Sequence, residues 1–104
     1  MQVIHQPRVA WDAARTLVAA MPDDDLFGWL AGEVGDLLGP DHERDLRDSR
    51  DRLCAVGDAL VPVEVGRWRV RLEDTLRSRP AAAEPLHALV GVATRLLRAR
   101  QVSP

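Results

Sequence analysis

Hydrophobic positions along this chain recur every three or four residues, which is the spacing of amphipathic helices. The clearest case is the stretch Asp25–Gly39, whose apolar side chains fall on one broad side of a helix. They are Leu26, Phe27, Leu30, Val34, Leu37 and Leu38. Such a wide apolar arc is typical of a helix that packs against several neighbours at once. We therefore expect this helix to lie at the centre of the fold.

Two further stripes, one near each end of the chain, are equally regular. They consist of Trp11, Ala14, Leu17, Val18 and Met21, and of Leu86, Leu89, Val90, Ala93, Leu96 and Leu97. Proline and glycine residues stand where the helices should end, at Pro22, Gly39, Pro40 and Pro80, because they terminate or cap helices. The pattern predicts an all-α fold, a compact antiparallel bundle of about five helices near 9–21, 25–38, 42–60, 64–78 and 85–100.

The segment Val61–Leu72 fits two patterns. Its apolar and polar residues alternate around Gly66 and Arg67, as in a β-hairpin with a two-residue turn. As a helix, it continues into the next turn with one apolar stripe, Val65, Trp68, Leu72 and Leu76. Pro62 would then suit the first helical turn. Because two strands without a third are marginal in water, the helix is the preferred interpretation.

Composition supports a helical, intracellular protein of one domain spanning residues 1–104. The chain is 46% hydrophobic and 29% charged, has three Trp, one Phe and no Tyr, and is rich in the helix formers Ala, Leu and Arg. Cys54 is the single cysteine, which fits a reducing compartment. No apolar run reaches the ~18 residues of a membrane span, and the N-terminus lacks the apolar core of a secretory signal. We therefore expect a cytoplasmic protein with no membrane partner. Its basic side chains are all Arg, a bias typical of GC-rich bacterial genomes.

Charge is unevenly distributed along the chain. Residues 1–60 hold six Arg and twelve acidic residues, a net charge of −6, whereas residues 61–104 hold eight Arg and four acidic residues, a net charge of +4. A polarised chain can neutralise itself by packing one half on the other, or it can attract a second copy. The sequence leaves both possibilities open.

The central helix carries a second pattern on its opposite side. Gly28, Gly32 and Gly35 line up there at intervals of four and three residues. Each helical Gly costs ~1 kcal/mol relative to Ala, so we expect compensation from close approach of another helix, in the core or in a second subunit. Trp29 lies at the edge of the apolar arc, where it would be either a lid over the core or an anchor at an interface.

A short leucine seam follows in the next helix, with Leu46, Leu53 and Leu60 spaced by seven residues. Ser49 weakens the seam and Pro62 limits it to about two heptads. Two heptads are too few for a coiled coil, so the seam predicts one long helix lying along a partner. Together with Trp29 and the three glycines, these leucines are the candidate interface residues.

Residues that could support catalysis, a cofactor or a metal are scattered. His5, His42 and His87 share no metal-ligand spacing, and one Cys provides too few soft ligands for zinc. The run Asp23–Asp25 is better explained as a helix N-cap than as a metal site. The glycines match no phosphate-binding motif. We therefore expect no catalytic, cofactor or metal site, and no enzyme.

The candidate basic patch is formed by Arg67, Arg71, Arg95 and Arg98. Arginines of this kind could pair with the phosphates of a nucleic acid, but the chain is acidic overall, unlike most nucleic-acid binders. The leading hypothesis is a small helical protein–protein interaction module, a homo-oligomer or an adaptor for a larger protein. In its sharpest form it is a homodimer that buries Leu53 or Trp29. A nucleic-acid-associated protein is the alternative, and an enzyme with a dispersed site comes third.

Overall fold

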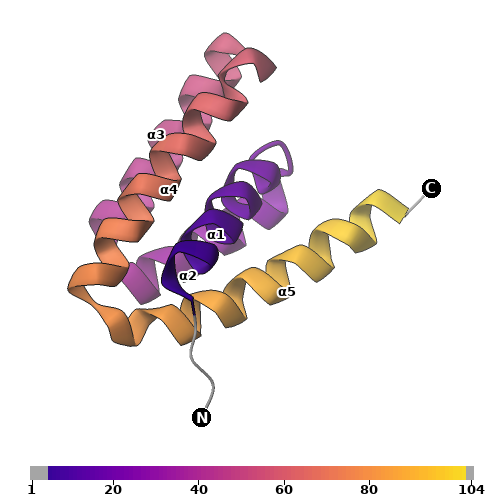
Figure 1. Ribbon diagram of the computed structural model, residues 1–104. Helices are drawn as coiled ribbons and strands as arrows, with labels where there is room; N and C mark the ends of the chain where they lie inside the picture. Colours follow the sequence, from indigo (N-terminus) through magenta and orange to yellow (C-terminus); the bar gives the residue numbers. More distant parts are fainter. Residues whose placement is uncertain (1–4, 103–104) are drawn as a thin grey trace.

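The computed structural model describes residues 5–102, and within them the chain forms five α-helices and two short 3-10 turns (Figure 1). The elements are α1 (Gln6–Ala20), α2 (Asp24–Leu38), α3 (Pro40–Val56), η1 (Asp58–Leu60), α4 (Val61–Ser78), η2 (Pro80–Ala82) and α5 (Ala83–Val102). The predicted all-α bundle is confirmed. Residues 1–4 lie outside the described range.

Helix ends follow the predicted breakers closely, with one correction. Gly39 closes α2 at φ +110°, and its N–H donates to the Gly35 carbonyl at 2.9 Å. The helix predicted near 42–60 begins earlier, with Gly39 as its N-cap and Pro40 in its first turn. It also ends earlier than residue 60, because Gly57 adopts φ +100° and terminates it after Val56.

The two interpretations tied to helix starts are confirmed. Val61–Leu72 is helical, with Pro62 in the first turn of α4. Asp23 is the N-cap of α2, because its Oδ1 accepts a hydrogen bond from the Leu26 N–H at 3.0 Å. The carboxylates of Asp24 and Asp25 lie in the first turn, where negative charge is favourable.

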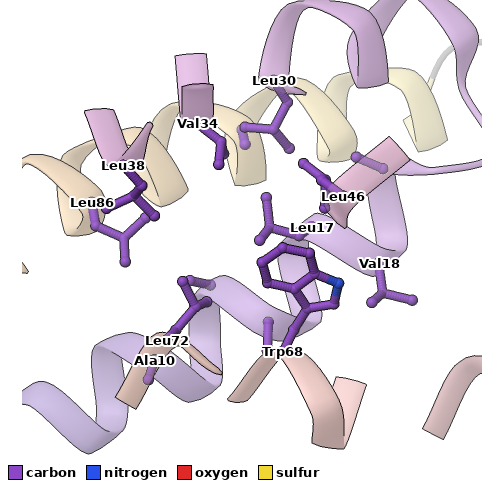
Figure 2. Close-up of a cluster of buried hydrophobic side chains, with 14 of the residues drawn as sticks. Ala10, Leu17, Val18, Leu30, Val34, Leu38, Leu46, Trp68, Leu72 and Leu86 are labelled. Atoms are coloured by element: carbon purple, nitrogen blue, oxygen red, sulfur yellow. The ribbon is translucent and has the colours of Figure 1, made fainter. Parts of the chain in front are cut away.

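The core is built where α1 packs against α4, and α2 against α3. On α1, the fully buried Ala10, Ala13 and Ala14 let the α4 backbone come close. The largest core side chain is Trp68 of α4, which is 0% exposed. Figure 2 shows it within a cluster that also holds Leu17 from α1 and Leu46 from α3.

The place of Trp11 in the N-terminal stripe predicted a core residue, and this prediction is wrong. Its side chain is 40% exposed and lies between the guanidinium groups of Arg15 and Arg69, 5.9 and 5.7 Å from the ring centre. Trp11 lies at the edge of the contact between α1 and α4, beside Arg69 of α4, whereas the smaller Ala10 and Ala14 of α1 are fully buried. Cation–π attraction stabilises the ring at the surface instead.

The glycines on the back of α2 are less crowded than expected. A Cβ added at Gly28 or Gly32 would have no neighbour within 4 Å, whereas one at Gly35 would collide with the flexible Glu43 side chain of α3. Close packing within the chain was therefore the wrong explanation for Gly28 and Gly32. Contact with a second subunit stays a prediction.

Two other glycines provide a test of backbone conformation. Gly66 lies inside α4 and Gly57 has φ +100°, and neither has a neighbour within 4 Å of an added Cβ. Gly66→Ala should stabilise the protein by up to about 1 kcal/mol through helix propensity. Gly57→Ala should destabilise it by about 1–3 kcal/mol, because Ala is strained in that conformation.

The measurement is the free energy of unfolding from urea denaturation of both variants. Because both sites are sterically open, equal effects of the two substitutions would contradict the assigned backbone conformations.

Candidate interaction surface

Helices α2 and α5 pack antiparallel, and contacts near both ends set their register. At one end, Arg100 Nε lies 2.7 Å from Asp23 Oδ2. At the other, Leu37 of α2 lines a shallow cavity together with Pro85 and Leu89 of α5. Both contacts give the same alignment, which places Trp29 of α2 level with the middle of α5.

Three of the large exposed hydrophobic side chains occupy that level. Trp29 is 38% exposed, and Val92 and Leu96, one turn apart on the side of α5 towards α2, are 36% and 39% exposed. We call these three residues the α2–α5 apolar patch. Tryptophan is enriched at the centres of protein–protein contact sites.

The two helices beside the patch carry opposite charge. Helix α2 has four acidic residues and no basic one, and α5 has three Arg and one Glu. Asp24 pairs with Arg50 of α3. Within residues 5–102, Asp25 and Asp36 of α2 and Arg95 of α5 have no ion-pair partner, and all three are exposed. The patch thus has an acidic flank and a basic flank.

The predicted leucine seam is divided among different environments. Leu46 is 0% exposed in the chain's own core, so its side chain is not available to a partner. Leu53 is half-buried and lines a cavity of about 210 Å³ with Val18 and Met21. Leu60 lies in η1, beyond the break at Gly57. The seam therefore provides no continuous outer stripe, and Trp29 is the best placed of the candidate interface residues.

Helices α3 and α4 are joined by a buried polar network that sequence reasoning missed. Ser49 of α3 is 0% exposed and donates to Glu64 Oε1 at 2.5 Å, and it accepts from the Trp68 indole N–H at 2.8 Å. Glu64 is 2% exposed and also accepts from Arg52 Nη2 at 2.7 Å. The available signal was a polar residue inside each apolar stripe, Ser49 between Leu46 and Leu53, and Glu64 one turn before Trp68.

The candidate basic patch is not one surface. Arg67 and Arg71 of α4 face α3, where Asp45 accepts a hydrogen bond from Arg67 Nη2 at 2.9 Å and lies 3.3 Å from Arg71 Nε. Arg95 and Arg98 are on α5, in a different part of the molecule. Two of the four arginines are therefore balanced by a carboxylate of the chain itself.

Burial and ion pairing act in opposite directions on Glu64. Burial raises the pKa of its carboxyl group. Hydrogen bonds from Arg52 and Ser49 and the charges of Arg52 and Arg67 lower this pKa by a larger amount, so it lies below that of an ordinary glutamate. The group is therefore charged at neutral pH, and the network holds an ion pair.

Comparison with protein-family models, with curated proteins and with solved structures finds no match to this chain. Among the helices of residues 5–102, none combines the length and the apolar character needed to cross a membrane. Within the same residues, no three His, Cys, Asp or Glu side chains are grouped as ligands of a metal ion. The function must therefore be argued from the surfaces described above.

The network predicts a specific pH dependence of stability. Since the folded-state pKa of Glu64 is lowered, its contribution is complete above the ordinary glutamate pKa of about 4.3 and is lost as pH falls through the folded value. Glu64→Gln should lower the free energy of unfolding by about 1–3 kcal/mol at pH 7. The loss should shrink as the pH drops from 5 to 3.

The measurement is urea denaturation across that pH range. Asp74→Asn is the matched control, because Asp74 belongs to an exposed pair with Arg77 on the same helix, and such pairs contribute little. A Glu64→Gln effect that is independent of pH would contradict the charged network.

Proposed function

We propose that this protein works by protein–protein contact, as a homodimer joined through the α2–α5 apolar patch. The observation that carries the proposal is the register of α2 against α5, which brings the exposed Trp29 level with the exposed Val92 and Leu96, on an acidic helix and a basic helix. A two-fold dimer uses the same surface on both copies, and this surface is complementary to itself.

Charge selects the orientation of the two copies. If α2 lay over α2 of the second copy, unpaired carboxylates such as Asp25 and Asp36 would face each other, and like charges in an interface cost several kcal/mol. If α2 instead lies over α5 of the second copy, the carboxylates of α2 face a helix with three Arg and one Glu, and Arg95 can lie opposite Asp25. The arrangement with α2 over α5 is therefore favoured, and it forms a four-helix layer around the two patches.

The open glycines of α2 fit this arrangement. Gly28 and Gly32 have no neighbour within 4 Å of an added Cβ, so a helix of the second copy could approach the α2 backbone closely. This contact would supply the compensation that the two glycines lack within the chain. A standard interface takes about 800 Å² from each partner, roughly an eighth of the 6363 Å² of accessible surface.

Nucleic-acid binding receives less support, because Asp45 and Glu64 already neutralise part of the candidate basic patch. An adaptor that uses the same patch on a larger protein is the alternative within the proposed class. Solution mass distinguishes this adaptor from the homodimer.

Sedimentation equilibrium at micromolar concentration should give twice the chain mass of 11.5 kDa. Trp29→Ala should weaken association by at least ~2 kcal/mol, about thirtyfold, as for a central interface Trp. Val63→Asp is the matched control, because Val63 is 57% exposed on α4; it should leave the mass unchanged. A monomeric wild type would rule out the homodimer and leave the adaptor.

The orientation has its own test in charge exchange. Asp25→Arg and Arg95→Asp should each weaken the dimer, since each places like charges opposite one another. The double variant should recover most of the lost affinity, because the attraction is restored with its sign reversed. Additive losses in the double variant would contradict the arrangement of α2 over α5.

A further inference from the structure

A polar pocket lies away from the α2–α5 apolar patch, between the start of α3 and the end of α4. It has a volume of about 320 Å³ and is lined by His42, Arg71, Asp74, Thr75, Ser78 and Arg79. That volume is at the lower end of the ~300–1,000 Å³ typical of ligand sites. The lining carries two guanidinium groups, an imidazole and two hydroxyls, against one carboxylate.

A chain of hydrogen bonds fixes the imidazole of His42. Thr75 Oγ1 donates its only proton to the Arg71 carbonyl at 2.9 Å, so it must accept from His42 Nε2, which lies 2.8 Å away. Neutral His42 therefore carries its proton on Nε2. The remaining nitrogen, Nδ1, is the one that takes up a second proton.

Both arginines keep donors that the protein does not use. Arg71 Nε lies 3.3 Å from Asp45 Oδ2 but makes no hydrogen bond, and both atoms are buried. Arg79 Nη2 donates a hydrogen bond to the Leu38 carbonyl at 2.9 Å. The other guanidinium nitrogens of the two residues donate to no side chain or backbone group within residues 5–102. Asp74, the one carboxylate of the lining, pairs with Arg77 at 3.3 Å.

The local potential at the imidazole is positive. Burial lowers the pKa of His42 first, and the charges of Arg71 and Arg79 lower it further, while Asp45 and Asp41 offset only part of the effect. Within residues 5–102, Arg79 has no ion-pair partner, so the pocket keeps a guanidinium charge that an anion can neutralise.

We propose that this pocket binds a small oxyanion of the phosphate class, free or as a phosphate monoester. Arg71 and Arg79 supply guanidinium donors, whose geometry matches phosphate oxygens, and the Ser78 hydroxyl adds a neutral donor. Two guanidinium groups attract a dianion more strongly than they attract a singly charged carboxylate.

Binding is coupled to the protonation of His42. A bound anion stabilises the imidazolium and so raises the pKa of His42, and by linkage the anion binds more tightly as pH falls through that pKa. The charged groups that face the ring come from both helices and the segment after α4: Asp41, Asp45, Arg71, Asp74 and Arg79. The coupling reports on the pocket itself, since the anion must reach His42 to produce it.

The test is a titration of isotope-labelled protein followed by NMR at constant ionic strength, with sodium chloride as the balancing salt. Inorganic phosphate should give saturable shifts at His42, Ser78 and Arg79. Sulfate, which keeps its charge between pH 5.5 and 8, should raise the pKa of His42 and bind at least threefold more tightly at the lower pH. Shifts that never saturate, or an unchanged pKa, would overturn the proposal.

Variants locate the site. Arg79→Gln should weaken phosphate binding at least tenfold, and Arg8→Gln, at an exposed arginine of α1 outside the lining, should leave it unchanged. Because Arg79→Gln also removes a bond to Leu38, Ser78→Ala at an exposed position provides a second variant, with an expected loss of about threefold. Equal losses for Arg8→Gln and Arg79→Gln, or acetate binding as tightly as phosphate, would contradict the assignment.

Discussion

The buried carboxylate of Glu64 is the interaction on which the pairing of α3 and α4 depends. These two helices meet through long polar side chains, and Glu64 accepts from Ser49 and Arg52 of α3 at once. Ser49 in turn accepts the indole N–H of Trp68, which allows the largest core side chain to be fully buried without an unsatisfied donor. The polar network and the apolar core therefore support each other, since Ser49 both donates to Glu64 and accepts from the core tryptophan.

The same network explains how the polarised chain neutralises itself. Arg52, Arg67 and Arg71 are all held by carboxylates between α3 and α4. Within residues 5–102, α2 keeps the unpaired carboxylates of Asp25, Glu33 and Asp36, and α5 keeps the unpaired guanidinium groups of Arg95 and Arg98. Ion pairs within the chain thus neutralise one part of the charge asymmetry between the two halves of the sequence, and the proposed dimer would neutralise another part. The proposed oxyanion pocket lies at the far end of α4, away from the proposed dimer surface, and shares Arg71 with the internal pairing.

The hydrophobic periodicity and the positions of proline and glycine were sufficient to predict the helices, because the apolar face of each helix depends on its local sequence alone. Contacts between helices were harder to predict from the sequence. Trp11 was assigned to the core because the stripe shows which face of the helix is apolar. The stripe does not show that the alanines of this helix are buried while the indole stays at the surface. Glu64 and Ser49 were missed because each is polar within an apolar stripe, and only the partner helix shows why. Gly57 ended α3 early through a backbone conformation that its neighbours do not reveal. The candidate interface was predicted in part: Trp29 was identified from its edge position, whereas Val92 and Leu96 required the register of α5 against α2.

The proposed dimer makes one atomic contact that no monomer can produce, between Trp29 of one copy and α5 of the other. The most direct measurement is an isotope-filtered NOE experiment on a mixture of labelled and unlabelled chains, which detects only contacts between copies. The account predicts NOEs from the Trp29 ring of one copy to the methyl groups of Val92 or Leu96 in the other. Intermolecular NOEs confined to Val63 and Val70 of α4, or none in a sample of dimeric mass, would contradict it.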